Sequence, residues 1–130
     1  MASVFSKIVA GEIPCYKVAE DAEFLAFLDI NPMTPGHTLV IPKQEEDYIF
    51  RLDDSSYLKL MAFAKKVALA IEKALPCLRV GLAVIGLEVP HVHIHLIPIQ
   101  KEADMNFSNP KLSLSADEMK SIAAQIAERM

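Results

Sequence analysis

Three of the four histidines in the chain lie at alternate positions, His91, His93 and His95. In an extended strand, side chains two residues apart point to the same face. Histidine is not a favoured strand residue, and protonated neighbours repel one another. The spacing therefore indicates a chemical role for this face. The opposite face would carry the apolar residues Val92, Ile94 and Leu96.

A row of imidazoles suits nucleophilic attack at phosphorus. A neutral imidazole is a competent nucleophile near pH 7, because its ordinary pKa lies near 6.5. If its second ring nitrogen gives a proton to a fixed acceptor, the attacking nitrogen keeps its lone pair. Flanking imidazoles can donate hydrogen bonds to the charge that develops on the phosphate.

A metal site is the alternative use of these side chains. Three histidines in one straight strand span about 13 Å between the first and last Cα atoms, whereas zinc needs each nitrogen at about 2.0–2.1 Å. A site with two of them would need ligands from elsewhere, and His37 is the only other histidine. Cys15 and Cys77 form no zinc-ligand spacing. We expect no metal and no cofactor.

Three helices are predicted from apolar residues recurring at the helical period. They cover Val4–Ala10, Ser56–Leu75 and Ser115–Arg129. Gly11 follows the first, where a left-handed residue would end it, and Pro76 stops the second. The residues that could cap them are Asp54, Ser55 and Ser56 for the second helix, and Ser115 with Glu118 for the third.

Short β-branched and apolar runs predict five strands. Cys15–Ala19 and Glu23–Leu28 are close enough to form a hairpin, and the continuous apolar run Val80–Ile85 predicts a strand buried on both faces. Residues 31–36 and 101–114 are expected to be loop or irregular. The remaining strands are His37–Ile41 and His91–Ile99. This order predicts an α+β fold with a mostly antiparallel five-stranded sheet, a long helix on one face and a C-terminal helix.

The composition fits a single domain over residues 1–130, with its C-terminal helix from about residue 115. The net charge is -4 and no stretch concentrates Lys and Arg, so we expect no nucleic-acid partner. There is no apolar run long enough to span a membrane and no signal peptide, so we expect no membrane association and a cytoplasmic location.

The sequence resembles the histidine triad family, in its bacterial Hint-like branch. Residues 91–97 fit the family pattern His-φ-His-φ-His-φ-φ, in which φ is apolar. Further similar segments occur in the family's order at residues 5–8, 12–14, 26–32 and 35–42, so the resemblance covers nearly the whole chain.

The resemblance implies a nucleotide hydrolase that acts on a purine nucleoside phosphoramidate or adenylate. His93 would attack the α-phosphorus, and water would cleave the nucleotidyl-histidine intermediate to a nucleoside monophosphate. His91 and His95 would orient His93 or contact the phosphate, with His37 beside them. Asp29 would hold the ribose hydroxyls, and the protein would form a symmetric homodimer. The purine would lie against apolar walls from Val4, Phe5, Ile8, Phe27 and Ile30.

The sequence departs from the family at the phosphate end of the site. Leu87 and Glu88 stand where many members carry Gln and then Ser or Thr. Glu88 is a candidate contact for a cationic leaving group, such as the lysine amine of a phosphoramidate. Two other functions stay open: cleavage of dinucleoside polyphosphates, and nucleotide binding or scaffolding with little turnover.

Overall fold

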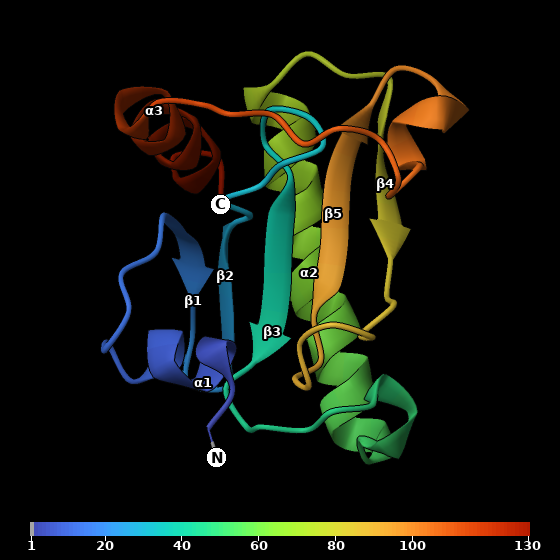
Figure 1. The fold of residues 1–130 in the computed structure, drawn as a ribbon. Coiled ribbons are helices and arrows are strands. Elements are labelled where there is room, and N and C mark those ends of the chain that lie inside the picture. The colour runs from blue at the N-terminus through green and yellow to red at the C-terminus, as the bar shows by residue number, and fades with distance from the viewer. Residues whose placement is uncertain (1) are drawn as a thin grey trace.

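The computed structural model describes residues 2–130. Five strands form one sheet in the order β1-β2-β3-β5-β4 (Figure 1). Every neighbouring pair in that order is antiparallel. The predicted α+β fold with a mostly antiparallel five-stranded sheet is thus confirmed. The strands are β1 Lys17–Glu20, β2 Phe24–Leu28, β3 Thr38–Pro42, β4 Arg79–Ala83 and β5 Ile94–Ile99.

The long helix α2 lies behind the sheet in Figure 1, with α3 beside it, and the short α1 lies in front. Their bounds agree with the predicted helices to within about two residues. No helix in the described chain is both long and apolar enough to cross a membrane. The helices are α1 Val4–Val9, α2 Asp54–Ala74 and α3 Ala116–Ala127, and two short 3₁₀ helices cover Ile49–Arg51 and Glu102–Met105.

Alternate residues of the central strands supply two separate apolar clusters. In β2, Ala26 and Leu28 pack with the α2 side, whereas Leu25 and Phe27 pack with Phe5 of α1 on the other side. All five residues of β2 are therefore buried. The residues Val92, Ile94 and Leu96 belong to the α2 side, as predicted. The histidines between them face the α1 side.

The helix caps agree with the sequence for α3 and differ for α2. The Ser115 hydroxyl accepts from Glu118 N–H, and Glu118 accepts from Ser115 N–H, which is the predicted capping box. The cap of α2 is Asp53, one residue before the predicted candidates, and its carboxylate accepts from Ser56 N–H at 2.7 Å. Leu75 is already extended because Pro76 follows it.

The strand predicted over His91–Ile99 begins later, at Ile94. Its partner β3 ends at Pro42, which has no N–H with which to continue the ladder. Val92 N–H instead donates to the Glu46 carbonyl at 2.7 Å. His91 and His93 therefore lie in an extended lead-in to β5, outside the regular ladder.

The prediction that Val80–Ile85 is buried on both faces is wrong. The strand is β4, Arg79–Ala83, which pairs only with β5 and forms an edge of the sheet. Leu82 is 47% exposed and Ile85 is 48% exposed. A continuous apolar run is typical of a buried central strand, but it also occurs on an edge that a partner covers.

Two glycines in the left-handed region provide a matched test of packing behind the site. Gly36 has φ +94 and Gly11 has φ +81. A Cβ at Gly36 would collide with Leu75 Cδ1 and lie 3.2 Å from Pro98 Cγ, whereas a Cβ at Gly11 would meet no other described atom within 4 Å. Both Gly→Ala changes carry the backbone cost of about 1–2 kcal/mol.

We expect Gly36→Ala to reduce the free energy of unfolding by at least about 1 kcal/mol more than Gly11→Ala, because of the added overpacking. Urea unfolding of both variants measures the difference. Equal losses would contradict the close packing of Gly36 against α2 and β5.

Candidate active site

His93 is held by the backbone of the first histidine. Its Nδ1 lies 2.8 Å from the carbonyl oxygen of His91. A carbonyl can only accept, so Nδ1 of His93 carries the proton and donates it. The proton of the neutral ring is thereby assigned to Nδ1, and Nε2 keeps a free lone pair. This is the tautomer that a nucleophile needs.

A second chain of hydrogen bonds fixes His37 and His95. The N–H of Met33 donates to His37 Nδ1 at 3.1 Å, so the proton of a neutral His37 is on Nε2. That Nε2 lies 2.9 Å from His95 Nδ1, which must therefore accept. His95 then carries its own proton on Nε2, as a donor. His93 and His95 lie side by side, with ring centroids 5.0 Å apart.

The ring of His91 has no free nitrogen. Its Nε2 donates to the Pro42 carbonyl at 2.8 Å, and its Nδ1 lies 2.7 Å from the Ser3 hydroxyl. The side chain is fully buried. Of the two roles implied for His91, orienting His93 and contacting phosphate, this geometry favours the first.

Burial keeps the flanking histidines neutral. It lowers the pKa of His37 to about 3 and the pKa of His95 to about 4, and the neighbouring imidazoles lower both pKa values further. Burial also lowers the pKa of His91. At neutral pH the hydrogen bond between His37 and His95 therefore joins uncharged rings.

The apolar wall beside His93 comes from α1 and β2. The Phe5 ring lies 5.1 Å from the His93 ring and 5.6 Å from the Phe27 ring, in edge-to-face arrangements. Ile8 packs against the same cluster. Val4 is on α1 but is 43% exposed. Phe5, Ile8 and Phe27 therefore lie in one apolar cluster beside His93.

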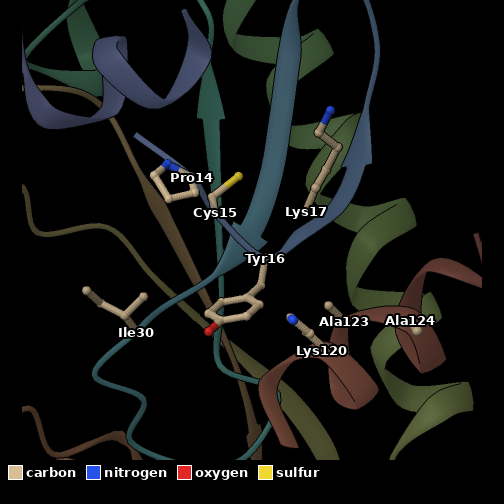
Figure 2. A pocket seen from close by; sticks show the side chains of 8 residues that line it. All are labelled: Pro14, Cys15, Tyr16, Lys17, Ile30, Lys120, Ala123 and Ala124. Atoms are coloured by element: carbon tan, nitrogen blue, oxygen red, sulfur yellow. The ribbon is translucent and has the colours of Figure 1, made fainter. Parts of the chain in front are cut away.

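Ile30 is not a member of this buried cluster. It is 69% exposed and lines a separate cavity of about 660 Å³ between the start of β1 and α3. Figure 2 shows its side chain across that cavity from Lys120, with Tyr16 between them. The four histidines do not line this cavity.

Asp29 lies beside the histidine chain. Its Oδ2 is 3.6 Å from His37 Nε2, and its Oδ1 accepts from Asn31 N–H at 2.9 Å. Burial raises the pKa of this carboxyl. One ligand atom each from Asp29, His37 and His95 lie within 4.8 Å of one another, a spacing that could hold a metal ion. An ion there would have to replace the hydrogen bond between the two rings.

Glu88 is exposed in the turn before the histidines, and so is Leu87. The structure brings the other acidic candidate, Asp29, close to the rings, but it leaves the side chain of Glu88 in solvent.

Phe107 and Lys111 are among the residues near the site that were not anticipated from the sequence. The Phe107 ring lies 4.9 Å from the His95 ring, and the ammonium group of Lys111 donates to the Phe107 carbonyl at 2.6 Å. The positive charge of Lys111 helps to lower the pKa of both His37 and His95. The segment is tied down by Leu112 N–H, which donates to the Pro32 carbonyl at 2.8 Å. No periodic pattern of residues in this stretch predicts the contact between Phe107 and His95.

Comparisons with known proteins consistently give one family. The family model for the HIT domain matches residues 10–102. The adenosine 5'-monophosphoramidase hnt1 of Schizosaccharomyces pombe is 37% identical over 132 residues, which cover 100% of this chain and 99% of that protein. An uncharacterized HIT-like protein of Borreliella burgdorferi is also 37% identical, with 95% of both chains covered.

Among solved structures, a Hit-like protein involved in cell-cycle regulation from Bartonella henselae superposes with a TM-score of 0.85. It is 27% identical, and the match covers 98% of this chain and 96% of that one. The chain therefore belongs to the histidine triad (HIT) family.

The lowered histidine pKa values predict an acid-sensitive fold. In the unfolded chain histidine titrates near 6.5, so between about pH 4 and 6.5 the unfolded state binds more protons than the folded state. The free energy of unfolding must then decrease as the pH falls through this range. We expect a loss of about 1–2 kcal/mol for each of His37 and His95 between pH 7 and pH 5.

Urea unfolding at both pH values measures this loss, and the His95→Gln variant is the control. Removing one low-pKa histidine should make the loss smaller than in the unaltered protein. An identical pH dependence in the two proteins would contradict a neutral, buried His95.

Proposed function

We propose that this protein is a nucleotide hydrolase that cleaves a purine nucleoside phosphoramidate or adenylate through a nucleotidyl-histidine intermediate. The observation that carries the proposal is the hydrogen bond from His93 Nδ1 to the His91 carbonyl. It leaves Nε2 of His93 with a lone pair, beside an apolar wall that could hold a base. The naming of similar proteins as adenosine 5'-monophosphoramidases supports the same class of reaction.

The first step is attack of His93 Nε2 on the α-phosphorus. The new P–N bond forms while the bond to the leaving group breaks, and the leaving group takes the bonding electrons and gains a proton from solvent. His95 Nε2–H would donate a hydrogen bond to a phosphate oxygen as its charge develops. Water then attacks the same phosphorus and gives up a proton to solvent, while the P–N bond breaks and its electrons return to Nε2 of His93. The products are the nucleoside monophosphate and free His93.

Substrate positioning falls to the groups around the rings. Phe5, Ile8 and Phe27 form an apolar surface for the base, because a buried aromatic wall suits a flat heterocycle. Asp29 is the acceptor proposed for the ribose hydroxyls. His37 acts through His95, since its Nε2–H donates to Nδ1 of that ring. Val4 and Ile30 would contribute at the exposed margin of the base site.

The test of the mechanism is mass spectrometry of the protein mixed rapidly with an adenylate substrate. We expect a covalent gain of one nucleotidyl group on the unaltered protein and no gain on His93→Ala. His93→Ala should also lose nearly all turnover. A persistent adduct in His93→Ala would place the nucleophile elsewhere.

Two other functions keep the same site but differ in what it does. A dinucleoside polyphosphate hydrolase would use the same attack with a phosphate leaving group. A nucleotide-binding or scaffold protein would bind without cleavage. Titration with AMP followed by assays on an adenosine phosphoramidate and on a diadenosine polyphosphate separates them. Binding without turnover of either substrate would select the scaffold, and turnover of the polyphosphate alone would select the polyphosphate hydrolase.

Glu88 is proposed as a selector of cationic leaving groups. Its carboxylate precedes the histidines and is exposed, so it is free to meet a lysine amine without the cost of desolvation. We expect Glu88→Ser to reduce kcat/KM more for an adenosine phosphoramidate whose leaving group is a lysine amine than for one whose leaving group is a neutral amine. Equal effects on the two substrates would remove this role.

We also propose a symmetric homodimer joined through β4 and a cytoplasmic location. The edge strand is free for pairing, and Leu82, Ile85 and Phe50 leave apolar surface exposed on the same side. Light scattering should give twice the mass of the chain. Leu82→Glu should shift that mass toward the monomer, and an unchanged mass would move the interface off β4.

A further inference from the structure

The hydroxyl of Ser3 makes hydrogen bonds both to helix α1 and to His91, the first of the three histidines. Ser3 is the N-cap of α1, and its Oγ accepts from Ser6 N–H at 3.0 Å. The same Oγ lies 2.7 Å from His91 Nδ1. Since His91 Nε2 donates to the Pro42 carbonyl, Nδ1 must accept, and the Ser3 hydroxyl is the donor. Ser3 and His91 are both buried.

A carboxylate anchors this serine from the other side. Glu45 Oε1 accepts from Ser3 N–H at 2.6 Å and from the Ser6 hydroxyl at 2.7 Å. These hydrogen bonds lower the pKa of Glu45 to about 2, so the carboxylate stays ionised across the working pH range. The network joins three separate stretches of chain: the start of α1, the segment after β3 and the lead-in to β5.

We propose that Ser3, Ser6 and Glu45 are positioning residues of the reaction, because they fix the ring of His91 and the helix that carries Phe5. The proposal rests on the proposed function, since the reaction is the one assigned to His93. It adds a set of residues that touch neither the substrate nor the reacting atoms.

Among residues 2–130, Ser3 is the closest donor to Nδ1 of His91. That nitrogen is buried, and a buried acceptor without a partner costs about 1–3 kcal/mol. The Ser6 hydroxyl, at 3.4 Å, is farther from Nδ1 and already donates to Glu45. Loss of the Ser3 hydroxyl would therefore release the ring, and with it the backbone carbonyl that orients His93.

The same loss would loosen the apolar wall. Phe5 is two residues beyond Ser3 on α1, and its ring contacts both His91 and His93, at centroid distances of 5.9 and 5.1 Å. A shift of α1 would change the distance between the base and the nucleophile. The network thus sets both the orientation of His93 and the position of the substrate in front of it.

The chain provides a matched control for the effect of losing a helix cap. Ser115 caps α3 in the same way, with its Oγ accepting from Glu118 N–H at 3.1 Å. The buried residues of α3 (Met119, Ala123 and Ile126) belong to the cluster on the α2 side, and no hydrogen bond joins Ser115 to a histidine among the described residues. Ser3→Ala and Ser115→Ala both remove an N-cap hydroxyl. Only Ser3→Ala removes a donor to His91.

We expect Ser3→Ala to lower kcat/KM for an adenosine phosphoramidate by about 10- to 100-fold, the size of loss that a small misplacement of a catalytic group causes. Ser115→Ala should leave kcat/KM unchanged. In ¹⁵N NMR spectra of the histidine rings, the Nδ1 signal of His91 should shift in Ser3→Ala and stay in place in Ser115→Ala.

A second pair of variants tests Glu45 without altering the serine. Glu45→Gln keeps an oxygen that accepts from Ser3 N–H, and should retain most of the turnover. Glu45→Ala removes the acceptor, and should reproduce the loss seen in Ser3→Ala. Similar losses in Ser3→Ala and Ser115→Ala, or an unmoved His91 Nδ1 signal in Ser3→Ala, would overturn the proposal.

The ring signals also separate this proposal from the proposed function. An unaltered protein without turnover on any adenylate would reject the hydrolase. A shifted His91 Nδ1 signal in Ser3→Ala would then still support fixation of the ring, and an unmoved signal would reject it.

Discussion

A single backbone carbonyl, that of His91, sets the tautomer of His93 by accepting its Nδ1 proton. The carbonyl is available because β3 ends at Pro42 and the histidine segment leaves the regular ladder there. The Pro42 carbonyl also accepts from Nε2 of His91, so the residue at which β3 ends also fixes the first of the three histidine rings. The irregular start of β5 is therefore part of the site.

The rest of the fold buries the histidine rings and fixes their orientation. On the α2 side, Val92, Ile94 and Leu96 are buried in the main core, which prevents the strand from rotating. On the other side, α1 presses Phe5 against the histidines. Burial lowers the pKa of the flanking rings and keeps them neutral. A neutral ring has one donor and one acceptor nitrogen, so the rings form a directed chain of hydrogen bonds. Met33 N–H donates to His37, and His37 donates to His95.

The period-2 pattern around the histidines and the period-3.6 pattern of α2 predicted the sheet and its covering helix, because both patterns reflect burial on one face. The edge position of β4 could not be predicted, since an apolar run looks the same in a central strand and in an exposed edge. The proposed site residues His37 and Asp29 followed from the family resemblance. Ser3 and Phe107, which contact the histidines, and Glu45, which holds Ser3, were not predicted, because these contacts join segments far apart in sequence with no local pattern to mark them.

The fold dictates which nitrogen of each histidine ring carries the proton. Neutron diffraction from a deuterium-exchanged crystal at neutral pH would locate these protons directly. We expect deuterium on Nδ1 of His93 and on Nε2 of His37, His91 and His95. Deuterium on Nε2 of His93, with its Nδ1 bare beside the His91 carbonyl, would contradict this expectation.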